Sequence, residues 1–366
     1  MYNYEASPVL LNIFLFLLLL YTFLPVYNGK NELNRKLSRT SDYIYAGVLI
    51  ILYCTFGYAD NDFYHYKDLY QSIGQEHMEP IYWWIKNHIT HNSYLSWRFI
   101  VWGLATILML WTVKRLDLDI RTSICFISIF YLMTLSIMRG NLGLSIMFLG
   151  YSYLVKPTHA RTVSYIWGTV LIAISYFFHS SMILSIAMLA VTPLKLNKKT
   201  VIISLVLFPV FVGIVTNFLT EVISGGLAFN NDMMNTGETL QSYAERDMSV
   251  SNINGKIAKS ITYLPIFVSM IYITYKVVFQ KIQLPKHIHC FFVYWYAMTY
   301  FASLFYFQET SQWLYIRFMM MAYFPMTVVL THYYSTCKTT RMMKLIMLLA
   351  LLACAYKLSY VIYSRL

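Results

Sequence analysis

Charged residues are scarce in this sequence: they make up 12% of its 366 residues, whereas hydrophobic residues make up 58%. A soluble globular domain carries about 25% charge, so the composition excludes an ordinary soluble protein. The hydrophobic residues gather in long runs, and only helices and closed barrels satisfy the backbone in lipid. Such runs do not fit the alternation of a barrel strand. We therefore predict an all-α, polytopic integral membrane protein.

Metal, redox and nucleotide motifs are also missing. The five cysteines lie scattered, mostly inside apolar runs, without CxxC spacing. No glycine-rich loop that would hold a nucleotide phosphate is present. We therefore expect no structural disulfide and no cofactor, and we assign no metal ligands.

Long apolar runs predict about twelve transmembrane helices in one polytopic domain, residues 1–366. The predicted spans are about 7–27, 42–58, 98–113, 122–138, 140–155, 163–178, 180–193, 200–219, 259–278, 287–307, 312–332 and 343–363. The run 180–193 is short enough to be tilted or re-entrant. No small-residue cleavage site follows the first run, so we predict an anchor there. Two long polar segments, 59–97 and 220–258, interrupt the spans.

The net charge of +12 would suit nucleic acid, but basic cytoplasmic loops explain it better in a membrane protein. If the N-terminus is outside and the spans alternate, roughly two thirds of the 28 Lys and Arg fall in inner loops. We therefore predict external termini, external segments 59–97 and 220–258, the lipid bilayer as a partner and no nucleic-acid partner.

Three polar residues fall at the outer ends of these spans: Arg139, His179 and Arg317. An arginine can bind phosphate oxygens in a bidentate manner, and a neutral histidine can accept a hydroxyl proton. Competing interpretations are a snorkelling arginine at 139, a simply hydrogen-bonded histidine at 179, and an ion pair of Arg317 with Glu309. Their joint placement favours one external site over these separate structural roles.

The first polar segment adds acids and aromatic residues. Asp60 and Asp62 can bind a cation or accept a hydroxyl proton, although an isolated acidic pair also suits a solvated loop. Pro80 can begin a helix, preceded by Glu79. Aromatic residues of this helix suit either a platform for sugar rings or an interfacial belt.

These residues, in this order, resemble a known family. The sequence has Asp60-x-Asp62-x-x-x-Tyr66, then Glu79-Pro80-x-Tyr82, Arg139, Phe178-His179-x-Ser181 and Arg317-Phe318. The arrangement is similar to the EpsG-like branch of the Wzy-type polysaccharide polymerases, over roughly residues 60–318. The resemblance implies an external site in the bacterial inner membrane that joins oligosaccharide repeat units carried on undecaprenyl diphosphate.

The resemblance also implies roles for individual residues. Arg139 and Arg317 would hold the donor diphosphate, and His179 would lie near the reacting hydroxyl. Asp60, Asp62 and Glu79 are candidate catalytic carboxylates, whereas Tyr66, Tyr82 and Trp83 are candidate sugar contacts. The sequence departs from the family after Arg139, where Gly140, Asn141 and Gly143 replace the usual Gln and small residue.

Two other functional classes stay open at this point. An O-antigen ligase would use similar arginines and a similar histidine. A flippase or transporter for lipid-linked sugars would instead show charges near helix centres and a two-fold repeat, and we find neither pattern in the sequence. Expected partners of a polymerase are the lipid-linked oligosaccharide, a flippase and a chain-length regulator.

Overall fold

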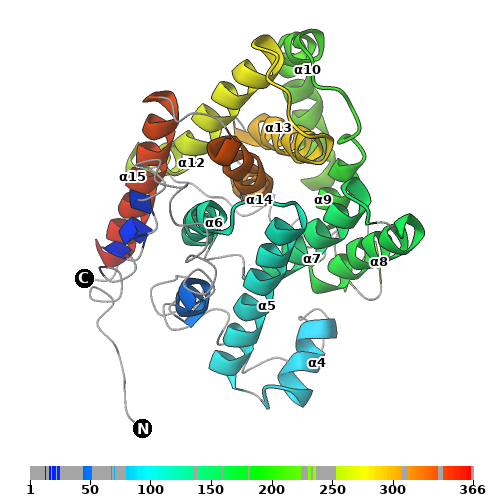
Figure 1. Cartoon of the computed structure of the whole chain (residues 1–366), viewed down its shortest axis with the longest axis vertical. Coiled ribbons are helices and arrows are strands. Elements are labelled where there is room, and N and C mark those ends of the chain that lie inside the picture. Colours follow the sequence, from blue (N-terminus) through cyan, green and yellow to red (C-terminus); the bar gives the residue numbers. More distant parts are fainter. Residues whose placement is uncertain are drawn as a thin grey trace. The chain divides into compact units, whose positions relative to one another are not determined.

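Helices form nearly all of the described part of the chain (Figure 1). The computed structural model describes residues 80–91, 93–134, 138–158, 160–179, 182–223, 253–306, 312–336 and 341–363, with residues 44–51, two short strands and single helical positions before residue 71. At several helix ends, including those that carry Arg139 and Arg317, it describes the backbone alone. The strands, Asn230–Asn231 and Met234–Asn235, pair antiparallel. The helical fold class is therefore confirmed.

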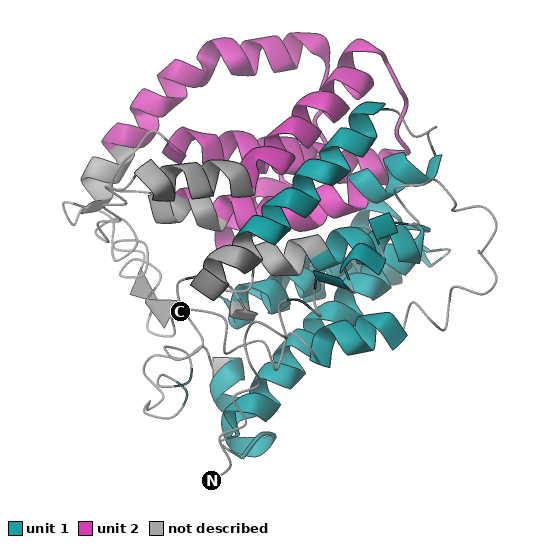
Figure 2. Ribbon diagram, turned by 90° about the vertical axis from the view of Figure 1, so that its left-hand side faces the viewer, with its two compact units in different colours: residues 1–182, 330–366 teal, residues 183–329 magenta. Residues whose placement is uncertain are grey.

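The chain divides into two compact units, which are described separately (Figure 2). Unit 1 comprises residues 1–182 and 330–366, and unit 2 comprises residues 183–329. Unit 1 contains α4 (Pro80–His88), α5 (Tyr94–Arg115), α6 (Ile120–Thr134), α7 (Met138–Val155), α8 (Arg161–Phe178) and α15 (Arg341–Tyr363). Unit 2 contains most of α9 (Met182–Leu189), α10 (Lys198–Ile223), α12 (Ile253–Thr274) with a π-helical turn (Tyr275–Phe279), α13 (Lys286–Tyr306) and most of α14 (Gln312–Thr336).

Helix α8 has its small and polar residues inside and its apolar residues outside. Ser164, Gly168 and Ser175 are its buried residues. Val163, Ile166, Trp167, Val170, Ile174 and Phe177 are exposed. Exposure of these apolar side chains to water is unfavourable, whereas their exposure to lipid is not. Small residues at the buried face let membrane helices approach closely. The arrangement supports a helix that faces lipid.

Two glycines bring α7 and α8 into close contact. A Cβ atom added to Gly150 would lie 2.7 Å from the carbonyl oxygen of Gly168. One added to Gly168 would lie 2.6 Å from Cδ2 of Leu154. Because neither position has room for a methyl group, the two backbones pack directly against each other. This contact fixes how the two helices are aligned along their length.

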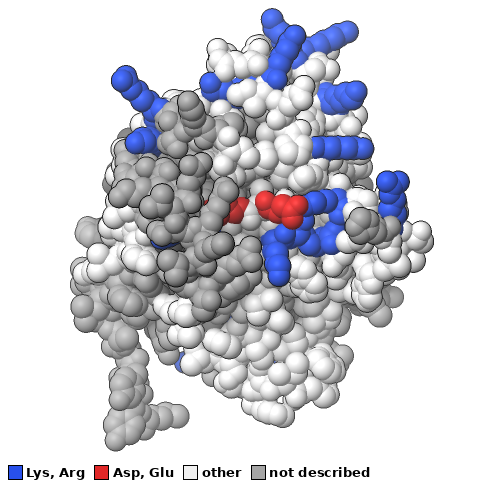
Figure 3. Space-filling model, viewed as in Figure 1, with Lys and Arg blue, Asp and Glu red and all other residues white. Residues whose placement is uncertain are grey.

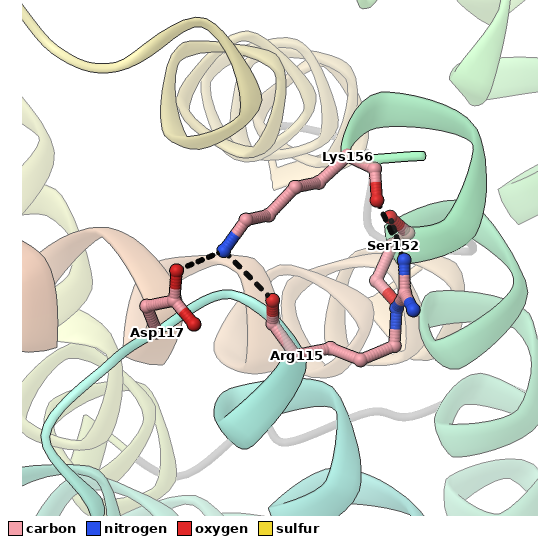
Figure 4. A network of polar contacts seen from close by, with 4 residues as sticks. All are labelled: Arg115, Asp117, Ser152 and Lys156. Carbon is pink, nitrogen blue, oxygen red and sulfur yellow. Dashed lines mark hydrogen bonds and ion pairs between the residues drawn. The ribbon is translucent and has the colours of Figure 1, made fainter. Parts of the chain in front are cut away.

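A polar network joins the C-terminal ends of α5 and α7 (Figure 4). Arg115 donates from Nε to Oγ of Ser152 at 3.1 Å and from Nη2 to the carbonyl of Lys156 at 2.6 Å. Lys156 Nζ donates to the carbonyl of Arg115 at 3.0 Å and forms an ion pair with Asp117. Since both helices end here, both begin at the opposite end of unit 1. Figure 3 shows acidic and basic side chains together where α5 ends, and an almost uncharged surface over α4 and the start of α5.

Six lysines of unit 2 lie together at one end, whereas Lys256 and Lys259 lie at the start of α12. Ser204 and Phe211 of α10 contact Tyr296 and Tyr300 of α13, respectively, so the two helices run parallel. Nζ of Lys198 lies 5.8 Å from the ring centroid of Phe279, which places the end of the π-helical turn beside the start of α10. The basic residues at this end are Lys195, Lys198, Lys199, Lys276, Lys281 and Lys286.

The predicted spans agree with the helices from α5 onward to within a few residues at most ends. Within the described residues, four helices are long and apolar enough to cross a membrane: Tyr94–Arg115, Arg161–Phe178, Lys198–Asn217 and Lys286–Tyr306. The shorter helices Gly140–Val155 and Tyr263–Phe279 are also apolar. The total of twelve spans, the external termini and the single domain stay predictions.

Helix α9 is much shorter than the predicted span 180–193. It has eight residues and is followed by turns that include Pro193. At 1.5 Å per residue it is about 12 Å long, and a membrane core is about 30 Å thick. Helix α9 therefore does not cross a membrane as a regular helix, which agrees with the tilted or re-entrant alternative.

Candidate functional site

The start of α7 lies beside the end of α8. A Cβ atom added to Gly143 would meet Cγ of Met182 at 3.0 Å and the carbonyl of Ser175 at 3.4 Å. Since α5 and α7 begin at the same end of unit 1, the backbone of Arg139, in the first turn of α7, lies at the same end as His179. The side chain of Arg139 is outside the described part, so its contact with a substrate stays a prediction.

His179 ends α8 in an extended conformation, with φ −163° and ψ 124°. Its backbone N–H donates to the carbonyl of Tyr176 at 3.2 Å, and its own carbonyl accepts from the N–H of Met182 at 2.9 Å. The side chain is 5% exposed. The imidazole is therefore held directly after the end of α8, where it can exchange a proton with a hydroxyl group that reaches it.

Tyr82 links three elements at this end. Helix α4 begins at Pro80, as predicted, and the fully buried ring of Tyr82 makes edge contacts with Trp97 of α5 and Phe178 of α8. The ring centroids are 5.6 Å and 5.8 Å away, respectively. Tyr82 thus positions the residue that precedes His179. Its predicted sugar contact stays a prediction, and that role requires its ring to leave this packed position.

The exposed aromatic surface of α4 lies on its other face. Trp84 is exposed, and its ring stacks on His88 with centroids 5.3 Å apart. Trp83 is half-buried, with its ring centroid 6.5 Å from that of His88. These rings offer an exposed aromatic surface, as the predicted platform for sugar rings requires. Their contact with sugar stays a prediction.

Arg98 is a buried charge that the sequence reasoning missed. Its side chain is 0% exposed; Nη1 donates to the hydroxyl of Tyr94 at 3.2 Å, and Cζ lies 5.8 Å from the centroid of that ring. The predicted span began at residue 98, which made the arginine a boundary residue. Helix α5 begins one turn earlier because Ser93 caps it by accepting from the N–H of Ser96 at 3.3 Å. Ser93 was the available signal, since serine is a preferred N-cap.

Tyr70 connects the first polar segment to this end of unit 1. Its hydroxyl lies 2.5 Å from Oγ1 of Thr90, and its ring packs against Tyr94 and Trp97 with centroids 5.5 Å and 5.2 Å away. Burial raises the pKa of Tyr70, opposed by the smaller effect of the hydrogen bond with Thr90. Lys86 is 7% exposed, with Nζ 5.2 Å from the centroid of Tyr70. Tyr70, Tyr82, Tyr94 and Trp97 thus form a cluster of packed aromatic rings.

Arg317 belongs to unit 2, in the second turn of α14. The same turns carry Tyr315, which packs against Tyr263 and Tyr306 with both centroids 5.2 Å away. This end of α14 lies beside the end of α13, and the group of six lysines in unit 2 lies at the start of α13. The side chain of Arg317 is outside the described part. Its convergence with His179 stays a prediction.

Four predicted site residues lie outside the described residues: Asp60, Asp62, Tyr66 and Glu79. Glu309, the alternative ion-pair partner of Arg317, lies outside them as well. The roles predicted for these residues stay predictions.

The comparisons with known proteins give one match. The sequence matches a family described as the EpsG family over residues 43–366, most of its length. No curated protein and no solved structure matches the chain.

Proposed function

This chain belongs to the EpsG family, whose members are Wzy-type polymerases, and we propose that it polymerises oligosaccharide repeat units linked to undecaprenyl diphosphate. The family match over residues 43–366 carries this proposal. The product would be an exopolysaccharide, a capsule or an O-antigen. The reaction would take place at the external face of the bacterial inner membrane.

The charge distribution of each unit supports an external site. In unit 1, Arg115, Lys156 and Arg161 lie at the end opposite to His179. In unit 2, six lysines lie at the end opposite to the start of α14, which carries Arg317, whereas Lys256 and Lys259 lie at the start of α12. Cytoplasmic loops are enriched in Lys and Arg. Applied to each unit separately, this rule supports an external position for His179 and for Arg317.

In the proposed reaction, a hydroxyl oxygen of the acceptor attacks the anomeric carbon of the donor sugar. The bond between that carbon and the diphosphate oxygen breaks, and undecaprenyl diphosphate leaves with the electron pair. The hydroxyl proton passes to His179 or to a carboxylate among Asp60, Asp62 and Glu79. Arg139 and Arg317 stabilise the charge that develops on the leaving group, an effect that is large in a low-dielectric site.

The proposal is tested by complementation of a strain that lacks the gene. Wild type should restore long glycan chains on a gel. Arg139→Ala, His179→Ala and Arg317→Ala should leave single repeat units on the lipid at normal protein levels. His91→Asn is the matched control, because His91 is an exposed histidine between α4 and α5 and is not among the predicted site residues.

The same experiment separates the alternatives. Long lipid-linked chains that are not transferred to a surface acceptor in the deletion strain would identify a ligase instead. Single repeats confined to the inner leaflet would identify a flippase. Normal long chains in the deletion strain would overturn the proposed function.

A further inference from the structure

Hydrogen-bond donors and positive charge gather at the start of α5. Arg98 is 0% exposed and Lys86 is 7% exposed, and they flank the Tyr70–Tyr94 ring pair. Trp97 is 1% exposed, and its indole Nε1 has no hydrogen-bond partner among the described residues. Burying a donor without an acceptor is costly, so the indole N–H points to an acceptor that binds here.

We propose that Arg98, Lys86 and the indole N–H of Trp97 form an anion-binding subsite for the diphosphate of the lipid-linked substrate. The inference rests on the proposed function. All three groups are donors, and phosphate oxygens are strong acceptors. The guanidinium of Arg98 can bind two phosphate oxygens at once. The surrounding aromatic rings exclude water, which strengthens each of these interactions.

The subsite lies on the same side of the unit as His179. Trp97 contacts Tyr82, and Tyr82 contacts Phe178, the residue before His179. A diphosphate held at Arg98 would therefore leave the attached sugar within this end of unit 1. In the described conformation the ring of Tyr82 packs edge-on against Trp97 and both are buried, so ligand entry requires α4 to shift away from α5.

A second arginine, Arg115, lies at the other end of α5. The guanidinium of Arg115 lies 3.6 Å from the ring centroid of Tyr153 and donates to Ser152 and to the carbonyl of Lys156. These contacts join helix ends within the protein, which makes Arg115 a structural arginine. It therefore provides a matched control for Arg98 on the same helix.

Binding to the full-length protein in nanodiscs tests the subsite. The probes are undecaprenyl diphosphate, undecaprenol and inorganic pyrophosphate, and the readout is the Kd from ligand-dependent thermal unfolding. Arg98→Gln should weaken binding of undecaprenyl diphosphate at least about tenfold, because a charged hydrogen bond is lost. Arg98→Lys should weaken it less, since the charge remains. Arg115→Gln should lower the unfolding temperature and leave the Kd unchanged.

The outcomes of these binding measurements decide whether the subsite binds the diphosphate. If pyrophosphate competes with the lipid in wild type and not in Arg98→Gln, the subsite recognises the diphosphate itself. Undecaprenol binding equal to that of the diphosphate, or an unchanged Kd in both Arg98 variants, would overturn the subsite. Wild-type glycan polymerisation tests the proposed function independently, so long chains together with an unchanged Kd in Arg98→Gln would reject the subsite alone.

Discussion

Single residues decide whether the end of α8 stays fixed, and Tyr82 is the clearest example. We predict that Tyr82→Ala destabilises the protein by about 3–5 kcal/mol, as expected when a buried aromatic side chain is removed. The loss should also lower polymer yield, because Phe178 and the adjacent His179 lose their support. Thermal unfolding of the purified protein measures the first effect, and a glycan gel measures the second.

The matched control is Trp84→Ala on the same helix. Trp84 is exposed, so its removal should change the unfolding free energy by less than about 0.5 kcal/mol. If Trp84→Ala and Tyr82→Ala lower the unfolding temperature equally, α4 is not anchored through Tyr82.

For single residues, the sequence was a better guide to which residues belong to the family motifs than to how each residue is packed. The resemblance drawn from short motifs is confirmed by the family match. His179 was placed at the end of its helix, where the structure has it. Arg98 was missed because hydropathy excludes a charge from an apolar run, so the predicted span began at this residue. Hydropathy registers the type of a residue, whereas burial of a charge depends on the tertiary packing around it.

Pairs of helices are held together by small residues, and Gly150 and Gly168 allow a direct test. We predict that Gly150→Ala and Gly168→Ala each destabilise the protein by about 1–3 kcal/mol, because the added methyl group overpacks the contact between α7 and α8. The unfolding temperature of the purified protein measures the effect.

Gly213→Ala on α10 is the control for this pair. An added Cβ at Gly213 has nothing within 4 Å, and alanine favours a helix by about 1 kcal/mol over glycine. Gly213→Ala should therefore leave the unfolding temperature unchanged or raise it. A decrease in all three variants would mean that glycine is needed for helix flexibility and not for close packing.

Helix positions were largely predictable, because each long apolar run must satisfy its backbone internally. Helix ends were less predictable. Helix α10 continues to Ile223 through Thr220 and Glu221, polar residues that hydropathy assigns to a loop. Helix α9 ends at Leu189, although its apolar run continues to Pro193. Caps and turns determine such ends, and an apolar run carries little information about them.

The division of the whole molecule into two units was not predictable from hydropathy. Units arise from contacts between helices distant in sequence, such as α15 with α6, and apolar runs do not encode their partners. The distribution of Lys and Arg is informative for the whole molecule, because the rule that cytoplasmic loops are basic applies to every loop. It predicts the same external side for His179 and Arg317, and the short helix α9 between them is the weak point of that prediction.

Cysteine labelling of intact cells tests that point. In a cysteine-free background, a membrane-impermeant maleimide should label Ser93→Cys directly and Asp117→Cys only after permeabilisation, since these residues lie at opposite ends of α5. Lys199→Cys, at the start of α10, should also require permeabilisation. If Lys199→Cys is labelled from outside, the segment around α9 does not cross the membrane and every later helix reverses direction. Arg317 would then face the cytoplasm, opposite to His179, and the two residues would not share one site.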